Sequence, residues 1–180
     1  WNKPYDRQIN VSGGSTTIAG TYFQLCQGVD DCGRAWPTTG NPGWLVQSGV
    51  THDGVDAAQS GNFNDDTSST MSTQVDGPTT VGFWWKVSSE ADYDFLTFYV
   101  DGTAVESISG EKDWTWKTYP LAAGAHTLAW TYAKDGAAYG GADAGWVDQF
   151  DAAADITPPT GTIAINNGAA PRRNPCRRPR

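Results

Sequence analysis

The sequence predicts an all-β fold, an antiparallel two-sheet β-sandwich of the jelly-roll type. Segments rich in Val, Thr and aromatic residues recur about every 10 to 15 residues with turn residues between them, as in such sandwiches. The chain contains 21 Gly and 10 Pro, which suit many turns, and nine Trp, seven Tyr and six Phe, which supply buried area. Strong helix formers are scarce, so bundles, coiled coils and βαβ folds are excluded.

The first third of the chain is dominated by turn signals. Residues 1–35 contain two short alternating segments, INVSG and TIAGTYFQL, which predict two strands with a Gly-rich turn between them. Residues 36–66 are dense in Pro, Gly, Asn and Asp, and predict a long loop region. Within that region, Trp44–Gln47 predicts a short strand.

Strand signals strengthen from Thr67 onward. Ser68–Val75 alternates polar and apolar residues, and Asp76–Pro78 is a turn sequence. Thr80–Val87 is expected to place alternate residues on one buried face, with Trp84 and Lys86 on the other face. The residues expected on the buried face are Val81, Phe83, Trp85 and Val87.

The remaining strands follow with turn residues between them. Asp101-Gly102 is a strong hairpin signal, and the AAGA segment after Leu121 is a turn. No helix of useful length is predicted. The predicted strands are Asp94–Val100, Thr103–Ser109, Asp113–Leu121, His126–Asp135 and Gly145–Asp151.

Two regions differ in composition, and we expect a sandwich module over residues 1–155. In 156–180, Pro158-Pro159 begins a linker, TGTIAI starts a strand without a partner, and PRRNPCRRPR is a basic tail. Residues 1–170 contain seven bases against all 20 acids, a formal charge of −13, and the tail contains five Arg. The tail is either an arm for anionic partners or residues foreign to the domain, and we favour the second interpretation.

The bulk properties also limit the partners and the compartment. An acidic surface repels phosphate, so nucleic acid is not an expected partner, and no apolar run is long enough to span a membrane. We expect a secreted, extracellular bacterial protein that is monomeric. Cys26 and Cys32 enclose a short loop and could form a disulfide in an exported protein, whereas Cys176 in the tail is expected to be unpaired.

The segment from His52 to Phe150 resembles a known class of module. The motifs HDGVDAAQSG, GFWWKVSSEADYDFLTFYVDG, ISGEKDW, AGAHTLAWTYAKDG and DAGWVDQF occur there in that order. Together they resemble the β-sandwich modules of large secreted bacterial proteins, related to concanavalin-like, MAM and cleaved-adhesin jelly rolls. The segment TPPTGTIAINNGA likewise resembles the start of an immunoglobulin-like repeat. The resemblance implies a non-catalytic appendage, often with calcium and sometimes with carbohydrate affinity.

Acidic loops make calcium the expected metal. Calcium takes six to eight oxygen ligands, which carboxylates and loop carbonyls supply. Because the first and last strands of a jelly roll are commonly neighbours, the loop with Asp53 and Asp56 could meet Asp143 and Asp148. The competing interpretation is that each Asp caps a turn. Other acidic candidates are NFNDD, with Asp65 and Asp66, and the pair Asp92 and Asp94.

The Trp excess suggests a carbohydrate site, because a flat ring stacks on the apolar face of a sugar while amides and carboxylates bind its hydroxyls. Trp114 and Trp116 are two residues apart and share one strand face. Trp116 is the first candidate for an exposed platform. The alternative is that the loop aromatics only fill the ends of the sandwich. The further candidates are Trp36, Trp44, Trp84, Tyr119 and Tyr139.

These observations favour a non-catalytic carbohydrate-binding module of an exported polysaccharide-active enzyme, with a polysaccharide or oligosaccharide as ligand and a tethered catalytic domain as neighbour. One alternative is an adhesin-like protein-interaction or spacer module of a secreted protease or surface protein. Another is a small glycoside hydrolase or lyase. The sequence contains no patterned carboxylate pair, no GxSxG elbow and only two His, so we expect no catalytic site and no zinc site.

Overall fold

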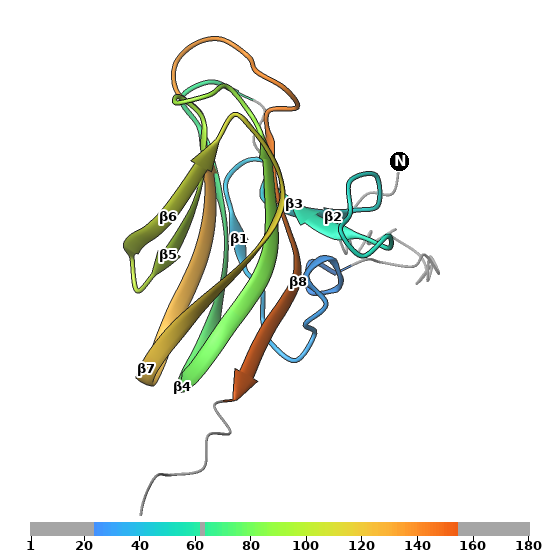
Figure 1. The fold of residues 1–180 in the computed structure, drawn as a ribbon. Coiled ribbons are helices and arrows are strands. Elements are labelled where there is room, and N and C mark those ends of the chain that lie inside the picture. Colours follow the sequence, from blue (N-terminus) through green and yellow to red (C-terminus); the bar gives the residue numbers. More distant parts are fainter. Residues whose placement is uncertain (1–23, 62–63, 155–180) are drawn as a thin grey trace, which may run out of the picture.

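The structure is a computed structural model that describes residues 24–61 and 64–154 (Figure 1). Its only helical element in this part of the chain is one 3-10 turn, η1 (Gln27–Val29), so the all-β prediction is confirmed. The predicted strands before residue 24, the linker, the start of a second module, Cys176 and the basic tail lie outside the described residues. The strands are β1 (Thr38–Thr39), β2 (Leu45–Gln47), β3 (Ala57–Gln59), β4 (Ser68–Ser88), β5 (Phe95–Val100), β6 (Thr103–Ser109), β7 (Glu111–Ala133) and β8 (Ala144–Ala154).

All strands pair antiparallel in the order β2-β3-β8-β4-β7-β5-β6, with β1 on β4. The register divides this sheet into two layers. In layer A, β2, β3 and β8 continue into residues 79–88 of β4 and 111–121 of β7. In layer B, β1, β5 and β6 join residues 68–77 of β4 and 124–133 of β7. The two long strands therefore belong to both layers of the sandwich.

The two long strands bend together between the layers. Gly77 of β4 lies opposite Gly124 of β7, and the register shifts between Gly77 and Thr79. The sequence predicts turns at both places, but the structure has continuous strands there. The two turn sequences lie beside each other and bend together. The hydrogen-bonded pairing of β4 with β7 therefore continues after the bend, at Thr79 and Leu121.

Aromatic rings fill the space between the layers. The ring centroid of Phe83, in layer A, lies 4.9 Å from that of Phe98 and 5.0 Å from that of Trp130, both in layer B. The inward face predicted for Thr80–Val87 is confirmed, since its four members are at most 1% exposed. Trp84 and Lys86 alternate with them and lie on the outer face of layer A.

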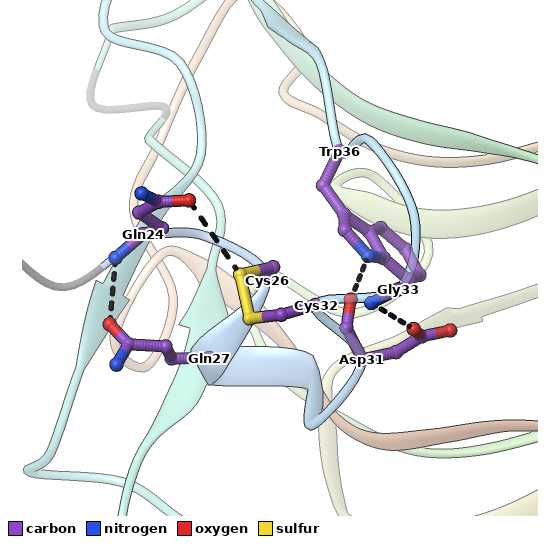
Figure 2. Close-up of a disulfide and its surroundings, with 7 residues drawn as sticks. All are labelled: Gln24, Cys26, Gln27, Asp31, Cys32, Gly33 and Trp36. Carbon is purple, nitrogen blue, oxygen red and sulfur yellow. Dashed lines mark hydrogen bonds between the residues drawn. A yellow bond between two sulfur atoms is a disulfide. The ribbon is translucent and has the colours of Figure 1, made fainter.

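The N-terminal described segment packs beside β8 and β3 (Figure 1). Its disulfide joins Cys26 and Cys32 and closes the loop that contains η1 (Figure 2), so the bond that the sequence left open is formed. Sequence patterns miss β1 and β3, which are too short to show an alternation. In the described ranges, no helix is long and apolar enough to cross a membrane.

Candidate functional site

Three neighbouring strands place aromatic and acidic side chains in one row on the outer face of layer A. Trp84 in β4 lies directly opposite Trp116 in β7 and, on its other side, opposite Asp148 in β8. Directly opposed residues of antiparallel strands point to the same side of the sheet. The row Asp148–Trp84–Trp116 therefore faces away from the core.

A β-bulge in β8 shapes this row. Gly82 pairs with Asp151 and Trp84 pairs with Asp148, so β8 uses one more residue than β4 over this interval. Within the bulge, Gln149 has a φ of 50°, in the left-handed region that a non-glycine residue seldom adopts. Bulges often change the direction of a side chain beside a binding site. Here the bulge brings the Gln149 amide to His52.

The aromatic part of the site consists of Trp84, Trp116, His52 and Trp114. The indole centroids of Trp84 and Trp116 are 5.7 Å apart, with planes inclined by 53°. The His52 imidazole stacks on Trp84 at 3.7 Å and meets Trp114 edge-on at 5.8 Å. Trp116 remains 39% exposed, so its ring is the one of this group that a ligand could reach from solvent.

A shallow hollow of about 370 Å³ lies beside these indoles. Apart from the two indole N–H groups, its polar side-chain groups are two carboxylates and one amide, and no Lys, Arg or His lines it. Such a combination of exposed ring and oxygen atoms suits a ligand with apolar C–H faces and many hydroxyl groups. The hollow is lined by Asp30, Trp84, Trp116, Gln149, Phe150 and Asp151.

An acidic cluster adjoins the hollow. Carboxylate oxygens of Asp30, Asp53 and Asp148 all lie within 4.8 Å of one another, a separation that one metal ion can bridge. Asp148 is buried, with 1% exposure, whereas Asp30 and Asp53 are exposed. Asp53 and Asp148, which the jelly-roll arrangement was expected to bring near each other, do meet, and Asp30 is the third member of the cluster.

The buried carboxylate of Asp148 is only half satisfied by the protein. Its Oδ2 accepts hydrogen bonds from the backbone N–H groups of His52, at 2.7 Å, and Asp53, at 3.4 Å. Its Oδ1 is buried and has no hydrogen-bond partner among the described residues. Buried polar atoms are almost always satisfied, so an orphaned carboxylate oxygen beside two other carboxylates indicates a place for a cation.

Electrostatics agree with this geometry. Burial, then the nearby carboxylates of Asp53, Asp148 and Asp56, raise the pKa of Asp30 above its ordinary value. Burial likewise raises the pKa of Asp148, although the backbone N–H groups of His52 and Asp53 oppose the rise. Three carboxylates with no base among them favour a hard divalent cation with oxygen ligands. Asp30, Asp53 and Asp148 could therefore hold a metal ion.

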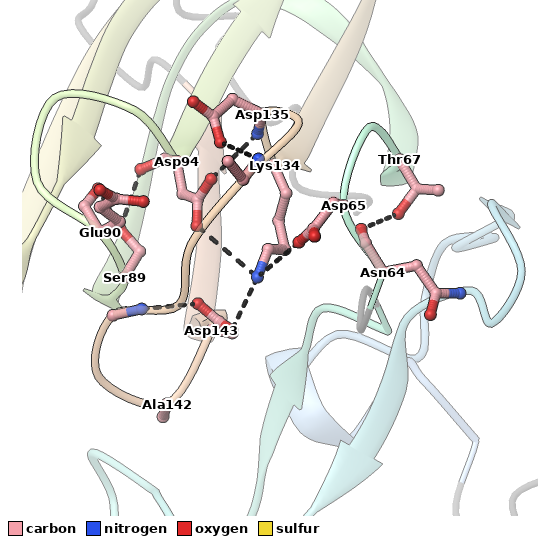
Figure 3. Close-up of polar contacts among 12 residues, drawn as sticks. Asn64, Asp65, Thr67, Ser89, Glu90, Asp94, Lys134, Asp135, Ala142 and Asp143 are labelled. Carbon is pink, nitrogen blue, oxygen red and sulfur yellow. Dashed lines mark hydrogen bonds and ion pairs between the residues drawn. The ribbon is translucent and has the colours of Figure 1, made fainter.

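Asp56 lies close to this cluster, and Asp143 lies elsewhere. Burial and the neighbouring Asp53 raise the pKa of Asp56, but its carboxylate is not one of the three that converge. Asp143 instead binds the buried ammonium of Lys134 at 2.6 Å (Figure 3). Strand proximity alone does not reveal that a long Lys side chain occupies the position expected for a metal.

Lys134 is enclosed by carboxylates, as Figure 3 shows. Besides Asp143, its Nζ lies 3.7 Å from Asp65 and 3.9 Å from Asp94, and 4.4 Å from the ring centroid of Tyr139. Burial alone would lower the pKa of Lys134, but the bond to Asp143 and the surrounding charges raise it above its ordinary value. This cluster therefore contains its own cation, and it links three loops.

The other aromatic candidates lie outside the hollow. Trp36 and Trp44 are buried, with 8% and 3% exposure. This agrees with the alternative interpretation of the sequence, in which the loop aromatics fill the ends of the sandwich. Tyr119 packs on Phe83 and Phe98 and donates its hydroxyl to Glu106. Tyr139 is 74% exposed but stands over Lys134. Of the six candidates, the structure brings Trp84 and Trp116 together at one site.

Sequence reasoning missed Asp30, His52 and Gln149. Asp30 lies in the segment before the recognised motifs, and only the fold brings it to β8. The feature of the sequence that could have indicated Asp30 is the acidic pair Asp30-Asp31, which lies between the two cysteines of a short loop. The bulge that directs Gln149 depends on the pairing of two strands and has no local sequence signal.

Comparisons with known proteins agree with the sandwich architecture. No protein-family model and no curated protein sequence matches the chain. The structure is similar to part of the secreted serine protease VesC from Vibrio cholerae, with a TM-score of 0.50 and 13% identity. That match covers 59% of this chain and 22% of VesC, so the chain spans about a fifth of that protein's length.

Two smaller solved domains are also similar. The carbohydrate-binding module TmCBM61, determined with β-1,4-galactotriose, gives a TM-score of 0.49 at 17% identity over 71% of this chain and 91% of the module. The K3 cleaved adhesin domain of Lys-gingipain from Porphyromonas gingivalis w83 gives 0.49 at 13% identity, over 66% and 91%. At such identities the likeness is one of fold, and function must be argued from the site.

Proposed function

We propose that this chain is a non-catalytic carbohydrate-binding module that holds a glycan on Trp116 and Trp84 and carries a structural calcium ion. The observation that supports it most directly is the exposed Trp116 ring beside a hollow whose polar wall is formed by Asp30, Gln149 and Asp151. The indole would stack on the apolar face of a sugar ring, and the three polar side chains would bind its hydroxyl groups.

The charge of the hollow indicates the class of glycan. Its lining contains two carboxylates and one amide but no Lys or Arg. Asp151 does not belong to the acidic cluster, so its carboxylate would repel a uronate or sulfated sugar even when a cation is bound there. Neutral polysaccharides or oligosaccharides are therefore the proposed ligands.

The calcium ion would stabilise the loops around the hollow. Its proposed ligands come from the disulfide loop, the loop before β3 and strand β8, through Asp30, Asp53 and Asp148. The disulfide between Cys26 and Cys32 is consistent with an exported protein. We accordingly propose a secreted, monomeric bacterial module tethered to a polysaccharide-active catalytic domain, whose tether raises the effective concentration of a weak binder.

Affinity electrophoresis tests the glycan proposal. Native gels containing cellulose, xylan, galactan or alginate derivatives, run with calcium, should show retardation on at least one neutral polysaccharide. Trp116→Ala should weaken binding by about 10- to 100-fold, as expected for a central Trp anchor. Tyr93→Ala, at a 57% exposed position outside the hollow, is the matched control and should migrate as the unaltered protein does. Absence of retardation on the whole panel would refute the proposal.

One observation favours a second function, a small glycoside hydrolase. Asp30 lines the hollow, and its pKa is raised by burial and by nearby carboxylates, as a general acid would require. A bound cation would counter the carboxylate part of this effect. Release of reducing sugar from a retained polysaccharide would support the hydrolase, whereas retention without release supports a binding module.

A further inference from the structure

The disulfide loop holds the backbone of Asp30 in a defined position. Asp30 ends η1 in the left-handed conformation, with its N–H bonded to the Gln27 carbonyl at 3.0 Å. The Cys26–Cys32 disulfide closes the loop, and the Trp36 indole donates to the Asp31 carbonyl at 2.7 Å (Figure 2). The loop packs directly on the start of β3, since a Cβ on Gly28 would lie 2.7 Å from the backbone of Ala57.

Asp30 belongs to two groups of residues. Its carboxylate lies within 4.8 Å of those of Asp53 and Asp148, and the same side chain lines the hollow beside Trp84 and Trp116. The position of one exposed carboxylate therefore affects both the cation ligands and the polar wall of the hollow.

His52 makes a second connection between the two groups. Its backbone N–H donates to Asp148 Oδ2 at 2.7 Å, beside the unpartnered Oδ1, while its ring stacks on Trp84 at 3.7 Å. The ring nitrogen Nδ1 also shares a 2.6 Å hydrogen bond with Gln149 Oε1, on the wall of the hollow. Asp53, the next residue, supplies a cluster carboxylate, so one short loop carries parts of both groups.

From this shared construction we infer that the disulfide-closed loop couples cation binding to glycan binding through Asp30. A cation would draw Asp30 and Asp53 toward Asp148 and fix the His52 ring on Trp84, which prepares the hollow. Coupling is reciprocal, so a bound glycan must raise cation affinity by the same factor. Cys26 and Cys32 act as positioning residues for Asp30. The inference rests on the proposed glycan function and adds its regulation.

Titration calorimetry on the intact chain measures this coupling. An oligosaccharide of the polysaccharide that retards the protein is titrated with calcium and with EDTA, and calcium is titrated with and without the sugar. Coupling free energies of ordinary size correspond to factors of roughly 5 to 150. We expect the sugar affinity to rise at least about fivefold with calcium and the calcium affinity to rise by the same factor with sugar. Equal sugar affinities with and without calcium would overturn the inference and leave the proposed function intact.

Three variants distinguish coupling from general destabilisation. Asp30→Asn should reduce calcium affinity and remove the calcium dependence of sugar binding, whereas Trp116→Ala should weaken sugar binding and preserve calcium affinity. Cys26→Ser/Cys32→Ser should lower the coupling factor toward one even at temperatures where the protein remains folded by circular dichroism. A double Ser variant with the full coupling factor would exclude the loop as the connection. If no sugar binds with calcium present, the proposed function fails, and the inference fails with it.

Discussion

The indole of Trp116 covers the backbone of Gly82. A Cβ built on Gly82 would lie 2.3 Å from Trp116 Cζ2, closer than non-bonded carbon atoms approach, and only glycine leaves room for this ring. Since Gly82 is buried and pairs with Asp151 across the β8 bulge, the strand cannot move away easily. The half-exposed indole must move if position 82 gains a side chain.

Gly82→Ala should therefore displace Trp116 without altering any polar group of the hollow. We expect sugar affinity to fall by about tenfold, in the range for loss of a Trp anchor, while the calcium-induced rise in melting temperature persists. Gly49→Ala is the matched control, because its nearest neighbour would be the Gln47 side chain at 3.5 Å, an ordinary contact. Unchanged affinity in Gly82→Ala would show that the Trp116 ring position is unimportant for binding.

Calcium should raise the melting temperature through Asp148. A ligand at a hundred times its dissociation constant stabilises the folded state by about 2.7 kcal/mol. For a domain of this size, that corresponds to a rise of about 5–10 °C. Scanning calorimetry with calcium and then EDTA measures it.

Asp148→Asn should abolish the calcium response, because it removes the carboxylate that is buried and partly unpaired. Asp92→Asn is the control, since Asp92 is exposed and has a φ of 69°, which Asn also adopts readily. A full calcium response in Asp148→Asn, or none in the unaltered protein, would contradict the assignment. Magnesium at the same concentration tests whether the site prefers the larger ion.

The sequence predicts the strands of this protein well because their alternation is local. In residues 80–87, the alternation of apolar residues is enough to show which face of the strand is buried. Asp101-Gly102 forms the expected hairpin turn, with φ values of 52° and 77°. From the sequence, the segments around Gly77 and Gly124 are predicted to be turns, because the residues near each of them do not show that the two segments lie side by side. Sequence thus locates the bends, and only strand pairing shows that the strands continue through them.

The candidate site is less predictable because its parts are distant in sequence. Trp84 and Trp116 can be singled out by strand spacing, and Asp53 and Asp148 by the neighbouring ends of a jelly roll. Asp30 meets them only through the packing of the disulfide loop on β3. Asp143 could be assigned to a metal for the same reason as Asp148, but its partner proves to be Lys134.

Lys134→Met should strongly destabilise the protein, because it removes the buried cation that, in the described part of the chain, faces Asp65, Asp94 and Asp143. Removing one partner of a buried ion pair costs about 3–5 kcal/mol. Of the three carboxylates, Asp94 would remain fully buried without compensation, whereas Asp143 and Asp65 are partly exposed to water. Urea denaturation measures the loss. Lys112→Met, at an exposed position, is the control and should change stability by less than about 0.5 kcal/mol. A loss below about 0.5 kcal/mol in Lys134→Met would contradict the role of Lys134 as the cation that compensates these carboxylates.

The pair of His126 and Asp101 should titrate together. Their side chains share a 2.7 Å hydrogen bond, which raises the pKa of His126 above 6.5 and lowers the pKa of Asp101 below 3.8. The His126 contribution to stability is complete below pH 6.5 and disappears as pH rises through its folded-state pKa. The Asp101 contribution is complete above pH 3.8 and disappears as pH falls through its lowered pKa. The pair therefore stabilises the β5–β6 hairpin end most between about pH 4 and 6.5.

Nuclear magnetic resonance separates this pair from other groups, because the chain has only two His residues, and His52→Gln assigns the signals. We expect the His126 imidazole to titrate above 6.5. Asp101→Asn should return that pKa toward 6.5, because an amide keeps a hydrogen-bonding oxygen but removes the negative charge that favours the imidazolium. Asp76→Asn, an exposed position in the bend of β4, should leave it unchanged. An unshifted His126 pKa in Asp101→Asn would mean that the backbone carbonyl of Ala122, which His126 Nε2 approaches at 3.1 Å, causes the rise instead.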